Sequence, residues 1–217
     1  MPSHLNIFDF DGTIAHTPCD NAENRSLYQK ETGIPWVISK ADSVHLTKKH
    51  GRFIGPRTGW WGRRETLEPP LVPDPTPENM FNPHVCKEFL ASKVDPEIVT
   101  IIMTGRHRGI SNQVLRILGD GGLVNVVRKP PKDDKLFIEL ADADVQVYFL
   151  GDDGPRPKGN KPSSTLEWKI WMLDQFLEVF PELKTIKFWE DRAEHVQAFQ
   201  QLDECLDQKV LVEFVQN

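Results

Sequence analysis

The chain alternates short apolar segments with stretches of helical pattern, and this alternation limits the folds it can adopt. Residues 5–10 and 98–103 are the clearest apolar segments, and both have the length of a strand. Strands that are apolar on both faces are typical of parallel sheets covered by helices on both sides. Further strands are expected at 124–127, 144–150, 185–189 and 209–215. Helices are expected at 84–93, 109–118, from Ser164 or Thr165 to Phe180, and at 193–205. The sequence therefore predicts an α/β fold with a Rossmann-like, doubly wound parallel sheet flanked by helices.

Residues 15–80 interrupt this alternation. Half of the six tryptophans lie here, as Trp36, Trp60 and Trp61. Helical pattern is weak and is confined to the neighbourhood of 21–32. Five prolines between positions 69 and 77 predict a stiff connector back to the alternating region. We therefore expect a catalytic core formed by 1–14 and 81–217, with an inserted cap or lid at 15–80.

Composition excludes several classes of protein. With 39% hydrophobic residues among 217, the chain can bury a core, and a net charge of −6 argues against a generic nucleic-acid coat protein. The three cysteines are far apart and form no CxxC pair, which argues against a disulfide framework or a zinc site. No secretory leader pattern opens the chain, and no apolar run reaches the length of a membrane span. We expect an intracellular protein, cytoplasmic or nuclear, that does not associate with membranes.

Two aspartates follow the first apolar segment, in the run Phe8-Asp9-Phe10-Asp11-Gly12-Thr13. At the end of a strand, side chains two positions apart point in the same direction. Asp9 and Asp11 would therefore face one pocket, where a bound cation would relieve their repulsion. Such a pair also permits one carboxylate to act as a nucleophile and the other as a proton donor.

A second polar group, Thr104-Gly105-Arg106, follows the apolar segment 98–103. The Thr104 hydroxyl and the Gly105 backbone N–H are suited to holding a phosphate oxygen, with support from the N-terminus of a following helix. Arg106 is expected to contribute a bidentate contact to the substrate.

The third and fourth candidates are Lys169, near the start of a helix, and the pair Glu190-Asp191 after the strand at 185–189. A phosphate-transfer site needs a cation for developing charge, and Mg²⁺ prefers oxygen ligands. We expect Asp9, the Asp11 carbonyl and Asp191 to hold Mg²⁺, with Glu190 as an outer group. Competing candidates are Lys129, Lys135 and Lys161 for the cation, and Asp152 and Asp153 for the acidic pair.

Together these groups resemble the four motifs of the haloacid dehalogenase (HAD) superfamily of phosphohydrolases. The resemblance implies that Asp9 forms an aspartyl-phosphate and that Asp11 acts as general acid and then base. It also implies that Thr104, Lys169 and the acidic pair Glu190/Asp191 complete an Mg²⁺-dependent site, and that residues 15–80 form a substrate-selecting cap.

A narrower resemblance concerns proteins that act on RNA ends. The Met103–Arg106 and Glu190–Arg192 runs are similar to the phosphatase half of bacteriophage polynucleotide kinase-phosphatase. Three further runs resemble the HAD domain of Swiss Army knife RNA-repair proteins: Gly59-Trp60-Trp61, Ser164 to Lys169, and Glu190 to His195. This resemblance implies a phosphorylated polynucleotide end as substrate, with a partner kinase or ligase on another chain.

Residues 40–64 add independent support for a nucleic-acid substrate. Seven Lys and Arg, including Arg63 and Arg64, stand there against one acidic residue, with Trp60 and Trp61 among them. Cations beside aromatic rings suit single-stranded nucleic acid, although a solvated basic face with buried tryptophans would show the same pattern. We therefore expect a phosphatase acting on polynucleotide ends, and the resemblance implies that these are RNA ends. The alternatives are a small-metabolite phosphatase and a non-catalytic nucleic-acid-binding domain.

Overall fold

The computed structural model describes residues 1–51, 53–55, 59–132, 135–142, 144–156 and 159–216. The chain divides into two compact units. Unit 1 comprises Met1–His16 and Pro75–Asn217, and unit 2 comprises Thr17–Asp74. Unit 2 is thus inserted after the first strand of unit 1.

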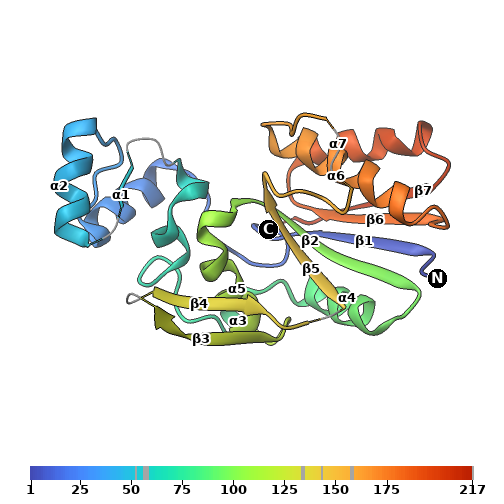
Figure 1. Cartoon of the computed structure of the whole chain (residues 1–217), viewed down its shortest axis with the longest axis horizontal. Coiled ribbons are helices and arrows are strands. Elements are labelled where there is room, and N and C mark those ends of the chain that lie inside the picture. Colours follow the sequence, from blue (N-terminus) through green and yellow to red (C-terminus); the bar gives the residue numbers. More distant parts are fainter. Residues whose placement is uncertain (52, 56–58, 133–134, 143, 157–158, 217) are drawn as a thin grey trace. The chain divides into compact units, whose positions relative to one another are not determined.

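Unit 1 is built on a five-stranded sheet in the order β5-β2-β1-β6-β7 (Figure 1). All four neighbouring pairs are parallel. The strands are β1 (His4–Asp9), β2 (Ile98–His107), β5 (Val145–Leu150), β6 (Thr185–Glu190) and β7 (Lys209–Phe214). The predicted α/β class with a parallel sheet is therefore confirmed.

Helices lie on both faces of this sheet, and β1 shows why. Ile7 belongs to a buried cluster with Trp168 of α6 (Thr165–Val179) and Phe199 of α7 (Ala193–Gln201). Phe8, the next residue, contacts Phe89 of α4 (Pro83–Val94) edge-to-face at 5.2 Å. Because successive side chains of a strand point to opposite faces, an apolar run of this kind requires cover on both sides. Figure 1 shows α6 and α7 on one face and α4 on the other.

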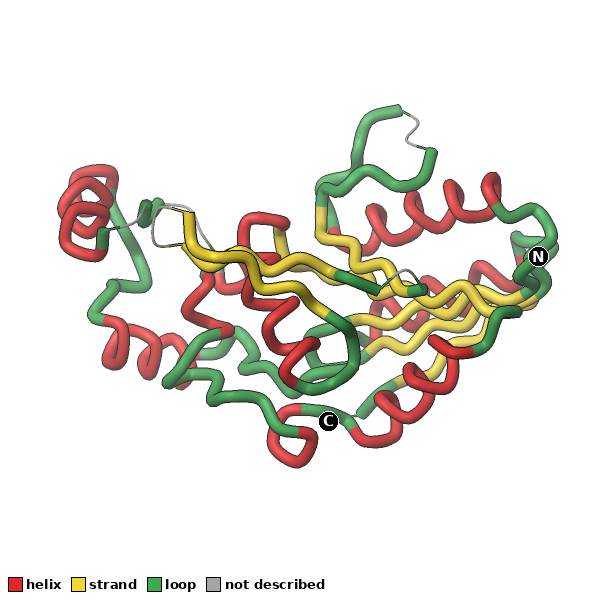
Figure 2. The backbone as a smooth tube through the Cα atoms, turned by 60° about the horizontal axis from the view of Figure 1, so that its bottom comes forward, coloured by secondary structure: helices red, strands yellow, loops and turns green. Residues whose placement is uncertain are grey.

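The predicted strand at 124–127 is not part of the parallel sheet. It leads instead into an antiparallel hairpin of β3 (Val126–Lys132) and β4 (Lys135–Leu140), which lies apart from the main sheet in Figure 2. Pro130 and Pro131 lie within β3. Because proline cannot donate a hydrogen bond, such a segment is unsuited to the centre of a sheet. These prolines were the sequence signal against a parallel strand here.

The remaining elements of unit 1 are short or lie outside the sheet. They are α3 (Pro77–Met80), the 3₁₀ helix η3 (Arg108–Ile110), α5 (Ser111–Asp120) and the 3₁₀ helix η4 (Leu202–Glu204). The predicted helices at 84–93, 109–118, 164–180 and 193–205 correspond to α4, α5, α6 and α7. No helix among the described residues combines the length and apolarity that a membrane crossing requires.

Unit 2 has its own small core. It contains α1 (Ala22–Thr32), α2 (Lys40–His50) and two 3₁₀ helices, η1 (Trp60–Gly62) and η2 (Arg64–Leu67). Asn21 and Ser39 cap the two α-helices. Buried together are Tyr28, Ile34, Ile38, Leu46, Ile54, Trp60 and Leu71, with Trp36 packed against them. The weak pattern near 21–32 thus does mark a helix, whereas α2 was not predicted. That this unit serves as a cap stays a prediction.

Candidate active site

Strand order brings the predicted polar groups to one edge of the sheet. β1 lies between β2 and β6 and is parallel to both, so the carboxyl ends of the three strands are neighbours. The chain places β2 and β5 on one side of β1 and then crosses to β6 on the other side. Ligands of doubly wound sheets bind at the carboxyl ends of the strands beside such a change of direction.

Asp9 and Glu190 end β1 and β6, and the Lys169 ammonium joins them. Its Nζ donates to Asp9 Oδ1 at 2.6 Å and to Glu190 Oε2 at 2.7 Å. Lys169 is only 1% exposed, and both carboxylates are buried. Burial alone would lower the pKa of Lys169, but the charges of Asp9 and Glu190 outweigh it and raise that pKa. Lys169 is therefore a charged, buried link between two strand ends.

Lys169 reaches this place because of how α6 begins. Ser164 caps the helix by accepting a hydrogen bond from the Glu167 backbone N–H. Lys169 then follows in the second turn, with Trp168 buried against the sheet. The competing lysines lie elsewhere: Lys129 pairs with Glu139, and Lys161 with Asp153. The side chain of Lys135 lies outside the described residues.

His195, to which the sequence assigned no role, supports Glu190. Its Nδ1 lies 3.0 Å from Glu190 Oε2, the same oxygen that accepts from Lys169. Burial would raise the pKa of Glu190, but Lys169 and His195 outweigh burial and lower it. Glu190 therefore stays ionised inside the protein. The sequence signal for this contact was the short spacing between Glu190, at the end of β6, and His195, in the first turn of α7.

Asp9, Glu190 and Asp191 form an acidic cluster, with one oxygen of each within 4.8 Å of the others. Asp9 Oδ2 and Asp191 Oδ1 are buried, and neither has a hydrogen-bond partner in the described part of the chain. Burial raises the pKa of Asp9 to about 6. Burial, together with the charges of Asp9 and Glu190, raises the pKa of Asp191 to about 7. Buried carboxylate oxygens without partners are costly unless a cation binds them, so this donor set fits Mg²⁺.

Asp11 and Arg106 form a second buried pair. The Arg106 side chain is 0% exposed, and its Nη2 and Nε donate to the Asp11 carboxylate at 2.7–3.1 Å. Thr104 Oγ1 accepts from the Arg106 backbone N–H at 3.1 Å and lies 3.5 Å from Asp11 Oδ2. The predicted partner of Arg106 was the substrate, whereas here its guanidinium holds Asp11.

A bulge in β2 places Arg106. The predicted strand ended at Met103, but β2 continues to His107, and its register against β5 shifts between Thr104 and His107. Gly105 and Arg106 occupy this irregularity, which bends a strand and redirects side chains. The next α-helix, which was predicted at 109–118, begins at Ser111.

The rival acidic residue Asp152 lies in a different environment. Its carboxylate accepts two hydrogen bonds from Arg108, both at 2.6 Å, and one from the Phe149 backbone N–H. It is not a member of the acidic cluster. These partners satisfy both carboxylate oxygens, and they identify Asp152 as a residue that stabilises the turn after β5.

The four residues of unit 2 that were predicted to contact the substrate differ in whether they are buried or exposed. Trp60 is fully buried, and Arg63 is buried with its guanidinium over the rings of Tyr28 and Trp36. Both are therefore core residues of unit 2 and offer no platform to a base. Trp61 is 36% exposed, and Arg64 forms an exposed ion pair with Glu68 at 2.8 Å. Arg52 and Arg57 lie outside the described residues.

Comparison with solved structures adds two similar chains. Both are the HAD domain of effector protein Lem4 from Legionella pneumophila, one of them an inactive mutant. Each is 11% identical, and the alignment covers 99% of this chain and 86% of that chain. The TM-scores are 0.45 and 0.44.

A family model matches residues 44–215, which is most of the chain. Its description is HAD domain family 1 in Swiss Army Knife RNA repair proteins. The match includes Thr104, Lys169, Glu190 and Asp191, while Asp9 and Asp11 precede it. Since β1 places Asp9 in contact with Lys169, the geometry joins the first motif to those inside the match. The chain therefore belongs to HAD domain family 1 of Swiss Army Knife RNA repair proteins.

Proposed function

We propose that the protein is an Mg²⁺-dependent phosphatase in which Asp9 is the nucleophile. One observation carries the proposal: Asp9 Oδ1 is held by Lys169, while its buried Oδ2 has no hydrogen-bond partner among the described residues, and Asp9 shares an acidic cluster with Asp191. A carboxylate fixed through one oxygen leaves the other oriented for attack. Its ionised form is supported by Lys169, which opposes the effect of burial on the pKa of Asp9.

The reaction proceeds in two displacements. Asp9 Oδ2 forms a bond to phosphorus as the ester P–O bond breaks, and Asp11 donates a proton to the leaving oxygen. Asp11 then accepts a proton from water, which attacks the aspartyl-phosphate and releases inorganic phosphate. Asp11 enters the first transfer in its protonated form, and Arg106 then orients the carboxylate that remains, which accepts the proton from water. Asp9, Asp191 and Glu190 would hold Mg²⁺, which supplies positive charge to the phosphate and offsets charge developing during transfer.

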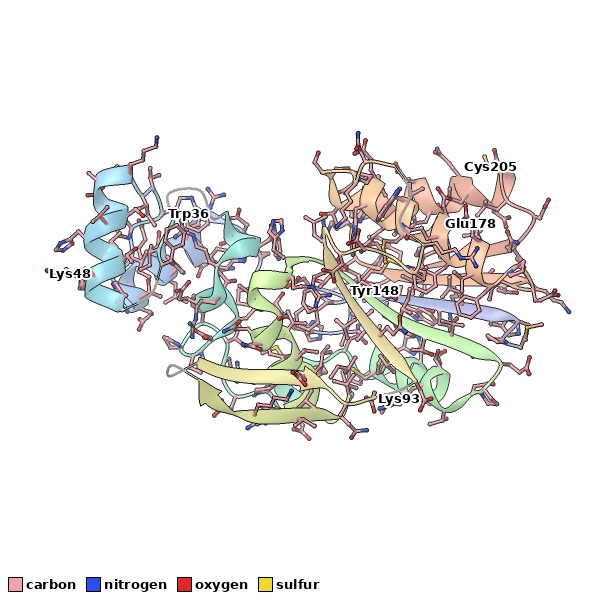
Figure 3. The ribbon with its side chains drawn as sticks, viewed as in Figure 1. Trp36, Lys48, Lys93, Tyr148, Glu178 and Cys205 are labelled. Carbon is pink, nitrogen blue, oxygen red and sulfur yellow. The ribbon has the colours of Figure 1, made fainter. Side chains whose placement is uncertain are left out.

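The proposed substrate is a phosphorylated polynucleotide end, and charge distribution supports it. Unit 2 contains nine Lys and Arg against seven Asp and Glu, a net charge of +2, whereas the whole chain has −6. Lys40, Lys48 and Lys49 are exposed on α2 and form no ion pair with any described residue. Figure 3 shows Lys48 on the side of α2 opposite Trp36. Exposed cations of this kind attract a phosphate backbone.

The catalytic proposal is tested by phosphate release from 3′- and 5′-phosphorylated oligonucleotides and from p-nitrophenyl phosphate, with Mg²⁺ or with EDTA. We expect Mg²⁺-dependent release by the native protein and none by Asp9→Asn. Full activity in EDTA, or turnover by Asp9→Asn, would refute the mechanism.

The substrate proposal is tested by reversing the three α2 charges, in a Lys40→Glu/Lys48→Glu/Lys49→Glu protein. We expect a higher KM for oligonucleotides and an unchanged KM for p-nitrophenyl phosphate. Loss of three contacts to a single strand should also reduce the slope of log affinity against log salt by about 2. The matched control reverses three exposed lysines of unit 1: Lys87, Lys184 and Lys209. Equal effects of the two triple variants, or higher activity on small esters than on oligonucleotides, would contradict the polynucleotide substrate.

A further inference from the structure

Arg192 is a cation at the acidic cluster to which neither sequence nor family comparison assigned a role. It directly follows Asp191, in the loop between β6 and α7. Its Nε lies 4.0 Å from Glu190 Oε1, and the charges of Asp9, Asp11, Glu190 and Asp191 all act on it. Its side chain is 29% exposed. Arg192 is therefore close to the carboxylates of the site and still accessible from outside.

The two other cations of the site already have partners. Lys169 donates to Asp9 and Glu190, and Arg106 donates three times to Asp11. Both are almost completely buried. Within the described part of the chain, the Arg192 guanidinium makes no hydrogen bond, and its ion pair with Glu190 is long. Lys169 and Arg106 therefore already use their donors to bind carboxylates, whereas the Arg192 guanidinium still has donors to offer a ligand.

Two groups from other elements lie next to this guanidinium. A Cβ atom built on Gly105 of β2 would lie 3.4 Å from Arg192 Nη2 and 3.2 Å from Thr165 Oγ1. Thr165 is the first residue of α6, a helix of 15 residues whose N-terminus is favourable for an anion. The position that a Gly105 side chain would occupy thus lies next to the Arg192 guanidinium, the Thr165 hydroxyl and the N-terminus of α6.

We propose that Arg192, assisted by Thr165, binds the non-bridging oxygens of the substrate's phosphoryl group across the space next to Gly105. The proposal rests on the phosphatase function and reassigns to Arg192 the phosphate contact predicted for Arg106. A guanidinium presents two parallel donors that match two oxygens of a phosphate. The same positive charge offsets the repulsion between a dianionic phosphate and the carboxylates around it.

The test measures binding of inorganic phosphate by calorimetry in the presence of Mg²⁺, together with kcat and KM for p-nitrophenyl phosphate. We expect Arg192→Gln to raise the phosphate Kd and the KM about tenfold or more, since it removes a charge-assisted contact. Arg192→Lys should recover only part of the affinity, because an ammonium lacks the paired donors. Gly105→Ala should also weaken phosphate binding, because its methyl group occupies the space beside Thr165 and Arg192.

Arg108→Gln is the matched control, because Arg108 also follows β2 but is paired with Asp152. It should leave the phosphate Kd unchanged. A phosphate Kd in Arg192→Gln equal to that of the native protein would overturn the proposal, as would an equal loss in Arg108→Gln. Native affinity in Arg192→Lys would refute the paired contact. If the native protein binds phosphate through Arg192 but hydrolyses no ester, the phosphatase proposal fails and the binding inference stands.

Discussion

Replacing Lys169 by methionine tests the charge arrangement of the site most directly. The substitution keeps much of the side-chain length and removes the one ammonium that contacts both Asp9 and Glu190. Two buried carboxylates would then lose their main compensating charge. Removing one partner of a buried ion pair costs about 3–5 kcal/mol, because the remaining charge has no solvent. In a chain of this length that corresponds to a decrease in Tm of roughly 10 °C.

The matched control is Lys187→Met. Lys187 also lies beside a carboxylate, with its Nζ 3.0 Å from Glu213, but its side chain is 27% exposed. Solvent screens such a pair, so its loss should cost about 1 kcal/mol or less. The two variants therefore make the same chemical change at a buried and at a partly exposed site.

The assay is urea unfolding of both variants in EDTA at pH 5.5 and pH 8. Without Lys169 the pKa values of Asp9 and Glu190 rise, so the folded variant binds protons more tightly than the native protein does. The extra destabilisation of Lys169→Met should therefore grow as the pH rises. Equal losses for the two variants, or a loss in Lys169→Met that does not change with pH, would refute the reasoning.

Three further predictions concern the acidic cluster. Burial raises the pKa of Asp9 to about 6 and that of Asp191 to about 7, so the folded protein binds these two protons more tightly than the unfolded chain does. The stability that comes from this proton binding is present below about pH 4 and is lost as the pH rises through 6 to 7. Mg²⁺ should thus raise the Tm more at pH 8 than at pH 5.5. At a concentration 100 times its Kd, it should add about 2.7 kcal/mol to the free energy of unfolding. A larger rise in Tm at pH 5.5 would contradict this. Asp191→Asn should abolish that shift in a thermal melt, whereas Asp152→Asn should keep it while lowering the Tm; the reverse pattern would identify Asp152 as the ligand. His195→Ala should reduce kcat severalfold and leave KM unchanged, because His195 acts only through Glu190; steady-state kinetics that show a change in KM alone would exclude this positioning role.

The fold class and the polar strand ends were predictable because they depend on local pattern. Residues 5–10 and 98–103 have apolar side chains on both faces, which only a sheet covered twice can bury. The hairpin at 126–140 was not predicted, since a short apolar run has the same pattern in a strand of a parallel sheet and in a strand of an antiparallel hairpin. The extension of β2 to His107 was missed for a related reason: the bulge depends on pairing with β5, which lies more than 35 residues further along the chain.

Residue types and their order predicted Asp9, Asp11, Thr104, Lys169 and Asp191 as site residues, because hard-cation and phosphate chemistry needs carboxylates, a hydroxyl and an amine at strand ends. The structure brings Asp9 and Asp191 into one cluster and joins Lys169 to Asp9, while the chemical roles of these residues stay predictions. Which side chains contact one another could not be predicted in this way. That Arg106 holds Asp11, that His195 supports Glu190, and that Trp60 and Arg63 lie inside a core all depend on contacts between distant segments. Spacing along a chain cannot distinguish a cation that faces the substrate from one that faces a carboxylate. That distinction depends on burial and on which charge lies nearest, and both arise only when the sheet and its helices pack together.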